Sequence, residues 1–453
     1  MSICSQNRKI FVLSPNREQF PCPVFPMGAL ELFSILVESQ KDAIFFDFCF
    51  AENWKESFSQ KLLSFNPAMI FISIRNIDNE VASQPKFYLD ELKEIVDICR
   101  AGSSAKIVVG GAGYNINPQE VLSYLKADYG LASLSKTALL SLIDLVENKQ
   151  KDCSRLKKIG GLSFFSQQTV CSNDSSVDWS WNLNKNWPLI FSNIDPRYFS
   201  FSKTEPHPAV AGLKTKYGCV CQCIHCSIPN IEGPCIQTAP IDEVGATLDL
   251  LVNRFAMKRI FFCDNVFNYP YEHALQICQE ISKRKLKFRW SCYLHPKWID
   301  EQLIFSMKQA GCENVCIGTD TAAPVLLKKW RKGFGQNDLK KCAFLCHKME
   351  LPVFYSLMIG GLGDSPEFLT ESLLFLKELN ARFIWAALGV RIYPKTSLAS
   401  SLINLGVLKE NESLLKPRFY ISPPVELEAL KIIREFKQKN PEILLKLNSG
   451  IAV

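Results

Sequence analysis

The chain has 453 residues, which is enough for two or three domains at about 150 residues each. Hydrophobic residues make up 47% of it and charged residues 21%, a balance typical of a soluble globular protein with sizeable cores. The formal net charge of +7 is spread over the whole length without a dense Lys/Arg run, so we expect no nucleic-acid partner.

The N-terminal apolar run is too short for a signal peptide, and no run reaches the roughly 18 apolar residues of a membrane-spanning helix. We therefore expect a cytoplasmic protein with no transmembrane segment. Its 18 cysteines would then be reduced rather than paired in disulfides. Most of them would be small buried hydrophobes, and a clustered minority could bind metal.

Residues 1–148 alternate between short apolar runs and amphipathic stretches. Strands are expected at 9–14, 42–50, 68–74, 106–111 and 129–133. Helices are expected at 27–39, 54–65, 87–102, 118–126 and 136–147. This alternation predicts an α/β domain with a doubly wound, Rossmann-like parallel sheet of the flavodoxin type.

Ligands on such sheets bind beyond the carboxyl ends of the strands. The polar and glycine residues at these ends are the binding candidates of the first domain: Asn16, Arg75, Asn76, Asp78, Gly110 and Gly111. An ordinary solvated strand end would explain Asn76 and Asp78 equally well.

A second βα series follows a linker or bridging segment at 149–205, where the pattern weakens. Between 206 and 423, strands are expected at 211–216, 258–263, 287–293, 313–318, 352–358 and 383–390. Helices are expected at 241–254, 271–285, 299–310, 337–350 and 366–379. Six βα units predict an open, partial TIM-like (β/α)6 barrel, and the C-terminal segment 424–453 begins with an amphipathic helical pattern over 424–446.

Four cysteines lie within eight positions of the stretch "KTKYGCVCQCIHCSIPNIEG", directly after the first predicted barrel strand. Cys219, Cys223 and Cys226 have the spacing C-x3-C-x2-C, and three thiolates on one tight loop can hold three corners of a cubane iron–sulfur cluster. The fourth iron then stays open for chemistry. Two alternatives remain: a structural zinc site, which normally takes two separated ligand pairs, and an inert buried cysteine cluster.

The loop "GCVCQCIHC" resembles the signature loop of the radical SAM superfamily. The longer run around it is similar to members with an N-terminal cobalamin-binding domain. The likeness continues through "FFCDNVFNYPYEHA" (261–274), "GCENVCIGTD" (311–320), "LMIGGLGDSPE" (357–367) and "GVRIYPKTSL" (389–398). In the first domain it rests on "PCPVFPMGAL" (21–30), "SIRNIDN" (73–79) and "GGAGY" (110–114).

The resemblance implies that Cys219, Cys223 and Cys226 bind a 4Fe-4S cluster whose open iron is chelated by S-adenosylmethionine (SAM). Reductive cleavage of SAM would then give a 5′-deoxyadenosyl radical. It also implies that the residue before the third cysteine, His225, stacks on adenine. Cys221 occupies a position that is not a ligand in the family, so we expect it to be a bystander.

Further candidates follow the predicted barrel strands, at the rim where functional residues of barrels gather. They are Asp264, Asn265, Thr319, Asp320, Gly360, Gly361 and Arg391. The resemblance favours a contact from Asp264 to the SAM amino group and a ribose contact from Asp320. Each candidate has a structural alternative, since Asp264 and Asp320 could cap helices, the glycines could make a turn, and Arg391 could be a surface charge.

Two further features have mainly structural explanations. His295 follows the third predicted barrel strand as an acid/base candidate, but a His-Pro pair at a strand end is more often a hydrogen-bonded turn. Cys342 and Cys346 share a helical face, where core burial is favoured over an auxiliary metal site.

For cobalamin, one absence is informative: residues 1–206 contain no histidine, so that stretch offers no imidazole ligand to a corrin cobalt. In addition, the family often has an acidic, glycine-rich turn after the fifth strand, where this chain has "ASLSK" (132–136). A first domain that has lost the cofactor is therefore an alternative.

The resemblance implies a cobalamin-dependent methyltransferase that acts on an unactivated carbon of a small-molecule, lipid-like or peptide substrate. Its electron donor would be a flavodoxin or a ferredoxin. Two rival functions stay open: another radical reaction such as cyclisation, oxidation or rearrangement, and a non-catalytic iron–sulfur protein.

Overall fold

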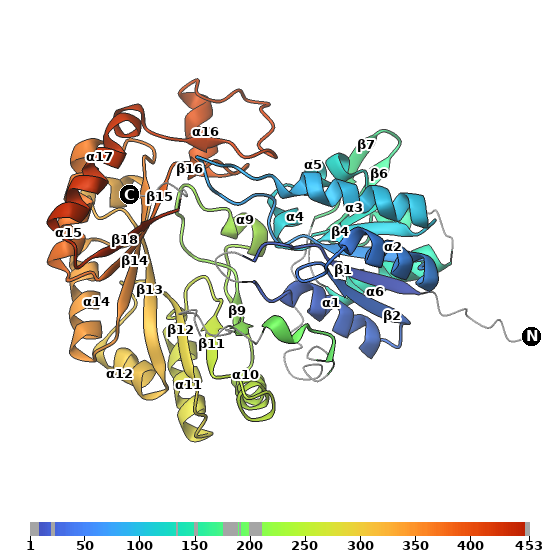
Figure 1. The fold of residues 1–453 in the computed structure, drawn as a ribbon, viewed down its shortest axis with the longest axis horizontal. Coiled ribbons are helices and arrows are strands. Elements are labelled where there is room, and N and C mark those ends of the chain that lie inside the picture. The colour runs from blue at the N-terminus through green and yellow to red at the C-terminus, as the bar shows by residue number, and fades with distance from the viewer. Residues whose placement is uncertain are drawn as a thin grey trace, which may run out of the picture. The chain divides into compact units, whose positions relative to one another are not determined.

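The computed structural model describes residues 9–19, 23–132, 135–148, 153–174, 189, 192–198 and 211–448. The chain divides into two compact units, one of residues 1–78 and 87–209 and one of residues 79–86 and 210–453 (Figure 1). The short segment 79–86 thus packs with the second unit, although the first unit holds its neighbours in sequence. None of the described helices is long and apolar enough to cross a bilayer.

In the described part of the first unit, seven strands form one sheet in the order β2-β1-β3-β4-β5-β6-β7. Five of them are parallel: β1 (Ile10–Ser14), β2 (Ala43–Asp47), β3 (Met69–Ser73), β4 (Lys106–Gly110) and β5 (Tyr129–Leu131). Their order, 2-1-3-4-5, is that of the flavodoxin-type fold, which confirms the prediction.

The last two strands, β6 (Leu162–Ser166) and β7 (Thr169–Ser172), add an antiparallel hairpin to this sheet. They lie inside the segment 149–205, which the sequence pattern identified only as a linker. Each strand is too short for the pattern to show a clear period, and pairing with β5 stabilises the hairpin. The predicted linker's residues 149–152, 175–188, 190, 191 and 199–205 lie outside the described part of the chain.

The helical elements in the described part of the first unit are α1 (Met27–Glu38), α2 (Trp54–Phe65), α3 (Tyr88–Gly102), α4 (Ala112–Ile116), α5 (Pro118–Leu125), α6 (Lys136–Glu147), α7 (Cys153–Leu156) and the 3-10 turn η1 (Pro196–Tyr198). Helices α1 to α5 of the first unit join the parallel strands, and α6 and α7 lead from β5 to the antiparallel hairpin (Figure 1). Strand β1 is buried along its whole length, as expected for a central strand that is covered on both faces.

The second unit contains a sheet of seven parallel strands in its described residues, in the order β18-β15-β14-β13-β12-β11-β8. Six of these are the predicted barrel strands: β8 (Ala211–Leu213), β11 (Arg259–Phe262), β12 (Arg289–Leu294), β13 (Cys312–Asp320), β14 (Val353–Ile359) and β15 (Phe383–Leu388). The seventh, β18 (Leu444–Leu447), was predicted as the end of a helix. Helix α17 (Pro423–Lys439) instead ends at Asn440, and the chain then pairs with β15.

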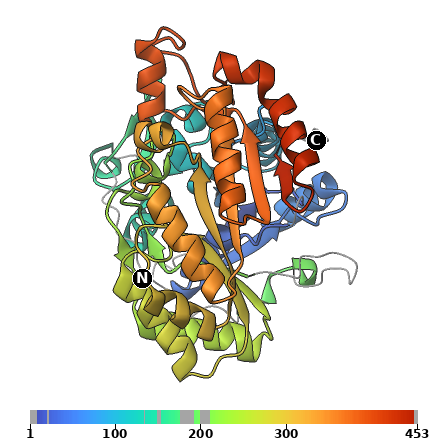
Figure 2. The same ribbon diagram turned by 90° about the vertical axis from the view of Figure 1, so that its left-hand side faces the viewer.

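The remaining elements of the second unit are helices around this sheet and two short antiparallel pairs (Figures 1 and 2). The helices are α9 (Ile228–Glu232), α10 (Ile241–Asp249), η2 (Leu250–Arg254), α11 (Tyr271–Lys283), α12 (Glu301–Gln309), α13 (Pro324–Lys329), α14 (Gln336–Lys348), α15 (Pro366–Glu378) and α16 (Ser397–Asn404). The pairs are β9 (Lys216–Tyr217) with β10 (Gln237–Thr238), and β16 (Val390–Arg391) with β17 (Phe419–Tyr420).

Buried and partly exposed side chains alternate along the barrel strands, so each strand has a covered face and a more open face. In β14, Tyr355, Leu357 and Ile359 are buried, whereas the alternate residues are partly exposed. Because side chains of a strand point to opposite faces in turn, the buried set packs under the helices and the other set lines the inner face of the barrel.

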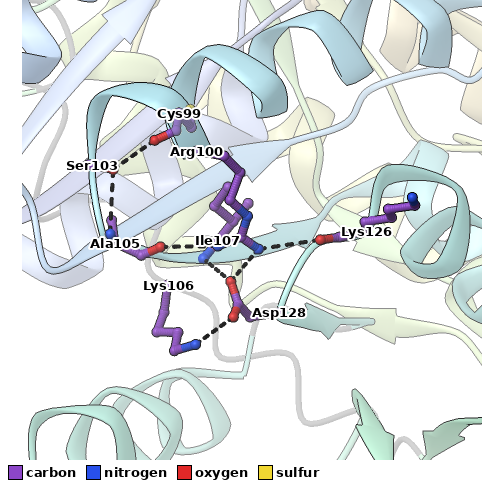
Figure 3. Close-up of polar contacts among 8 residues, drawn as sticks. All are labelled: Cys99, Arg100, Ser103, Ala105, Lys106, Ile107, Lys126 and Asp128. Atoms are coloured by element: carbon purple, nitrogen blue, oxygen red, sulfur yellow. Dashed lines mark hydrogen bonds and ion pairs between the residues drawn. The ribbon is translucent and has the colours of Figure 1, made fainter. Parts of the chain in front are cut away.

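A partly buried carboxylate fixes the amino-terminal edge of the first unit's sheet. Asp128, just before β5, accepts hydrogen bonds from Arg100 Nη2 and Lys106 Nζ at 2.6 Å each and from the Ile107 amide at 2.9 Å (Figure 3). Burial alone would raise the pKa of Asp128, but these hydrogen bonds outweigh it and hold the pKa below its ordinary value. The network connects α3, β4 and β5 at the edge opposite the ligand-binding one.

We predict that Asp128→Asn lowers the free energy of unfolding by about 2 kcal/mol near neutral pH, because three donors lose a charged acceptor. A carboxylate with a lowered pKa stabilises the fold above its ordinary pKa of 3.8, and this contribution disappears as the pH falls through its folded-state value. The difference between wild type and variant in thermal unfolding should therefore stay constant above about pH 5 and shrink as the pH falls further. Asp97→Asn, an exposed control on α3, should change little; an equal loss there would contradict the assignment.

Candidate functional site

The cysteine loop runs from Gly218, after β9, to Ser227, before α9, without regular secondary structure. Gly218 has φ +88°, and a Cβ there would lie 2.0 Å from the Cys235 carbonyl oxygen, so only glycine fits. The loop then returns, with the Cys219 amide bonded to the Gly233 carbonyl at 3.2 Å and the Cys226 amide to the Cys223 carbonyl at 3.2 Å. Three predicted ligands thus lie on one tight, internally bonded turn.

Ile224 anchors the middle of this loop. Its side chain is 7% exposed and belongs to an apolar cluster that includes Trp330 and Leu398. Its amide donates to the Trp330 carbonyl at 3.2 Å, and its own carbonyl accepts from the Leu398 amide at 2.8 Å. Because Ile224 stands between Cys223 and Cys226, this anchorage fixes where both thiols lie.

Asp264 fixes the start of the loop rather than facing open space. Its carboxylate is fully buried and accepts from the Thr215 amide and hydroxyl at 2.6 Å each, from the Lys216 amide at 3.1 Å, and pairs with Lys216 Nζ at 3.7 Å. Both oxygens are therefore used within the chain. The structure gives no support to the predicted contact with the SAM amino group.

Asn265 has a similar positioning role. Its Nδ2 donates to the Gly218 carbonyl at 3.1 Å and to Glu232 Oε2 at 2.7 Å. The same Glu232 oxygen accepts from the Gly218 amide at 3.1 Å, and Glu232 also pairs with Lys214. These polar contacts thus connect the start of the cysteine loop to α9, the helix that follows it.

A buried ion pair lies beside the loop. Asp320 Oδ2 is 2.5 Å from Lys332 Nζ and 3.3 Å from His225 Nε2, and its Oδ1 accepts from the Ser356 hydroxyl at 3.3 Å. Burial acts to raise the pKa of Asp320, but Lys332 and His225 outweigh it and hold that pKa well below its usual range. The neighbouring Thr319 is fully buried and bonds a carbonyl of its own strand, so it does not join the pair.

The backbone of β13 directs Asp320 toward the loop. The pairing of β13 with β14 shifts register between Ile317 and Asp320, and Asp320 has φ +60°. Bulges and left-handed residues of this kind re-aim side chains near functional sites, and Asp is among the residues that tolerate them. The strand end is thus shaped to present this carboxylate.

The four thiols differ in their surroundings. Burial raises the pKa of Cys223 and raises that of Cys226 to about 12, while the positive charge of Lys332 opposes the shift of the Cys223 pKa. A hydrogen bond with Cys221 lowers the pKa of Cys219 to about 7. The extra cysteine is therefore a neighbour of a predicted ligand.

No three Cys, His, Asp or Glu side chains of the described residues converge on a point that could hold one metal ion. A mononuclear zinc site needs its ligands around a single ion. A cubane differs, because each thiolate binds a different iron atom. The donor set fits such a cluster: three thiols on one loop, a lysine that can compensate thiolate charge, and a His225 Nδ1 that is buried without a partner in the described chain.

The glycines after β14 serve packing. A Cβ on Gly361 would lie 2.3 Å from the Trp330 ring, and one on Gly360, which has φ +84°, would lie 2.8 Å from the Ile421 side chain. Both glycines were candidates at the barrel rim, with a simple turn as the alternative. Their neighbours in the structure are instead side chains of the same unit, including the Trp330 that anchors the cysteine loop.

Arg391 was one of the candidates at the barrel rim. It is 5% exposed, and its guanidinium donates to the carbonyls of Ile392, Leu414 and Leu415 at 2.5, 2.9 and 3.3 Å. It therefore connects β16 to the segment before β17.

His295 and the helical cysteines take their structural alternatives. The ring of His295 stacks on Trp298 at 4.0 Å, and burial lowers its pKa to about 4. Its Nε2 lies 3.2 Å from the Lys332 carbonyl, so it supports the turn that carries Lys332. Cys342 and Cys346 are fully buried in α14.

The candidates of the first unit gather where the strand order reverses, between β1 and β3. The Gly111 turn after β4 packs directly on the turn after β3: a Cβ on Gly111 would lie 2.5 Å from the Ile74 carbonyl oxygen, and the Ile74 amide bonds the Gly110 carbonyl at 2.7 Å. Arg75 and Asn76 are exposed at this edge, whereas Asp78 is buried. Asn16 Nδ2 is buried without a partner in the described residues. Crevices at such switch points bind ligands.

Residues 213–376 match the family model described as the radical SAM superfamily. This segment is a radical SAM domain. It spans β9, the cysteine loop and the strands from β11 to β14, and it contains Asp320, Lys332 and Ser356. The last two carried no motif that sequence analysis could recognise.

Relatives match over much more of the chain than the radical SAM domain. The tryptophan 2-C-methyltransferase of Streptomyces laurentii is 21% identical over 448 residues, which cover 87% of this chain and 75% of that one. The structure of the radical S-adenosylmethionine methyltransferase TsrM from Kitasatospora setae, with cobalamin and a [4Fe-4S] cluster bound, is 19% identical at a TM-score of 0.81, covering 97% and 93%. The cobalamin-dependent S-adenosylmethionine radical enzyme OxsB is 14% identical at 0.72, covering 96% and 67%. At these identities the likeness shows a shared fold.

We predict that Asp320→Asn destabilises the protein by about 3 kcal/mol, because it leaves the Lys332 ammonium buried without its counter-ion. Combining it with Lys332→Met should cost clearly less than the sum of the two single changes, since the stranded charge is removed. Thermal unfolding of the four proteins measures this coupling. Glu301→Gln, which breaks an exposed pair with Lys348, serves as the control and should cost less than about 1 kcal/mol. Strictly additive losses would contradict a coupled pair.

Proposed function

We propose that the chain is a cytoplasmic, cobalamin-dependent radical SAM enzyme that transfers a methyl group to an unactivated carbon of a small molecule. The observation that carries this proposal is the anchored three-cysteine loop beside the Asp320–Lys332 pair, within a radical SAM domain. The flavodoxin-type sheet of the first unit supports it, as do relatives named as methyltransferases with cobalamin and a [4Fe-4S] cluster. The described cysteines are free, which suits a reducing compartment.

Cys219, Cys223 and Cys226 would hold the 4Fe-4S cluster. Such a cluster, when bound with SAM at its open iron, supplies the electron that breaks a carbon–sulfur bond of the sulfonium. The residues around it position the loop and keep water out: Ile224 seats its middle in the apolar core, and Asp264 holds its start. His225 lies at the edge of the same space, with one ring nitrogen bonded to Asp320 and the other free for a ligand such as adenine.

Asp320 carries the second part of the site. Its carboxylate stays ionised beside Lys332, and it lies at the carboxyl end of a barrel strand, where ligands of such folds bind. In our proposal it also accepts hydrogen bonds from the ribose hydroxyls of SAM, together with Ser356. Because the pair is already fixed by the protein, binding needs little rearrangement.

Cobalamin would bind at the switch point of the first unit. The unpartnered Asn16 amide and the exposed Arg75 and Asn76 can hydrogen-bond the corrin amides. The Gly110–Gly111 turn has no side chains that would project from the strand end toward the corrin. Cobalamin, when bound, supplies a carrier for the methyl group. Residues 1–206 have no histidine, so no imidazole from that stretch competes for the cobalt.

The inner face of the barrel favours an aromatic or flat apolar substrate. Trp385 is 37% exposed on this face, in register with Ser356, which contacts Asp320. Phe383 and Phe354 extend the aromatic surface, with ring centroids 5.0 Å apart. An exposed aromatic surface that continues into a charged pair can bind an apolar ring and orient a polar group. The relative that acts on tryptophan is consistent with this class.

Anaerobic purification with cluster reconstitution, followed by iron, sulfide and cobalamin quantification, tests the cofactors. Incubation with SAM labelled in its methyl group then tests the reaction against a panel of aromatic small molecules. Label transferred to carbon supports the proposal. Formation of 5′-deoxyadenosine without any labelled product would favour another radical reaction, and no SAM turnover a non-catalytic protein.

We predict that replacing Cys219, Cys223 or Cys226 by Ala abolishes the absorbance near about 400 nm expected of a thiolate-bound cluster. Cys221→Ala should keep it, because that thiol is only a neighbour of Cys219. Spectra and iron content of the four reconstituted variants measure this. The reverse pattern would mean that a different set of thiols binds the cluster.

We predict that Trp385→Ala weakens binding of tryptophan, used as the aromatic probe, by roughly tenfold, or about 1.4 kcal/mol. The indole ring loses its stacking surface on the inner barrel face, while the cluster loop is untouched. Isothermal titration calorimetry of the reconstituted protein measures the affinity. Phe344→Ala is the matched control, since Phe344 is 67% exposed on the outer helix α14. Equal effects of the two changes would contradict the proposed binding face.

A further inference from the structure

Exposed and buried side chains alternate at the end of helix α13 and in the turn that follows it. Lys328, Lys329 and Arg331 are exposed, whereas the neighbouring Trp330 and Lys332 are buried. Arg331 adopts φ +54°, so the helix stops there and the chain turns inward at Lys332. Three positive charges are therefore presented to solvent within four residues of sequence.

The buried members of this segment contact the cysteine loop and the ion pair beside it. The Trp330 carbonyl accepts the Ile224 amide at 3.2 Å. Lys332 Nζ lies 2.5 Å from Asp320 Oδ2, and the same oxygen lies 3.3 Å from His225 Nε2 of the loop. The exposed cations thus lie on the same short stretch of backbone as the residues that contact the cysteine loop.

These cations have no acidic partners in the described chain. None of the ion pairs found among the described residues involves Lys328, Lys329 or Arg331. Lys328 and Arg331 also line a surface hollow of about 470 Å³, together with the side chains of Leu327 and Phe334. The carboxylate in the same hollow, Asp338, already accepts the Gly335 amide. The surface is therefore positive, with an apolar floor.

We propose that this surface, formed by Lys328, Lys329 and Arg331, is the docking site for an acidic one-electron donor protein of the flavodoxin type. The inference rests on the proposed function, because reductive cleavage of SAM consumes one electron that the chain itself does not generate. The donor passes from its hydroquinone to its semiquinone form, and the cluster accepts the electron. No bond forms between the two proteins.

Charge complementarity selects this occupant. A small cluster of unpaired cations steers an acidic protein and raises its association rate, and electron-transfer encounters are small and short-lived. The position matters as much as the charge, because a donor bound here lies against the segment whose Trp330 carbonyl bonds Ile224 in the middle of the cysteine loop. A nucleic acid would need a longer basic track, and the net charge of +7 is spread over 453 residues.

The test follows electron transfer itself. Reduced flavodoxin is mixed with the cluster-loaded protein in a stopped-flow instrument, and loss of the flavodoxin hydroquinone is recorded. The triple variant Lys328→Glu, Lys329→Glu, Arg331→Glu should slow this reaction about tenfold or more at low salt. The control variant Lys431→Glu, Arg434→Glu, Lys439→Glu makes the same change in charge on α17 and should stay within about twofold of wild type.

Reduction of the cluster by dithionite, which needs no docking, should be unchanged in both variants. The wild-type rate with flavodoxin should also fall as salt rises from about 50 to about 300 mM. Equal slowing in both triple variants, or a wild-type rate that does not change with salt concentration, would overturn the proposal. The salt series decides the question even if the charge-reversed protein fails to hold its cluster. SAM cleavage with dithionite as the reductant tests the proposed function, and oxidation of flavodoxin tests the docking site. If SAM is not cleaved with dithionite, only the proposed function is contradicted.

Discussion

The site is organised by the buried pair of Asp320 and Lys332. Burying two charges costs several kcal/mol per ion, so the pair is retained only where further hydrogen bonds satisfy it. Here His225 and Ser356 bond the carboxylate. The pair and these partners come from four places: Asp320 from β13, Lys332 from the turn after α13, His225 from the cysteine loop and Ser356 from β14. One electrostatic centre thus fixes the separation of the loop from the barrel strands.

The pair also explains why the residues around it are so heavily constrained. Trp330 anchors the loop through Ile224. Its ring occupies the space that a side chain at position 361 would take, so glycine is required there. Lys332 follows two residues later, and its carbonyl bonds the buried His295. Several residues that look like ligands in the sequence therefore hold the loop and its neighbours in place. Their chemistry is used to position thiols.

Most strands of the fold could be predicted from the sequence, because a buried strand leaves a local pattern of apolar residues. Buried parallel strands such as "KIFVLS" and "VFYSLMI" are apolar runs between helical patterns, and five of the first unit and six of the second were placed within a few residues. The hairpin β6–β7 and strand β18 were missed, because each is short and depends on pairing with a distant strand. The cysteine loop was recognisable from its spacing alone.

The candidate roles that the structure does not support share one cause. A strand-end Asp, a glycine turn or a buried Arg has the same sequence signature whether it meets a cofactor or its own backbone. Asp264 and Arg391 meet the backbone, and that depends on which groups the fold leaves unpaired nearby. Lys332 and Ser356 were missed for the complementary reason. A single lysine or serine in the sequence does not show that it will contact Asp320 in the fold.

The position of Lys332 joins the inner chemistry of the site to its outer surface. Thiolates that bind a cluster are negatively charged, and their net charge and hydrogen bonds set the reduction potential of such centres. The ammonium of Lys332, whose charge acts on Cys223, would therefore favour the reduced, more negative state of a bound cluster. The same turn of chain presents Arg331 to solvent one residue earlier. An electron entering at that surface thus moves toward the place where the protein already stabilises added negative charge.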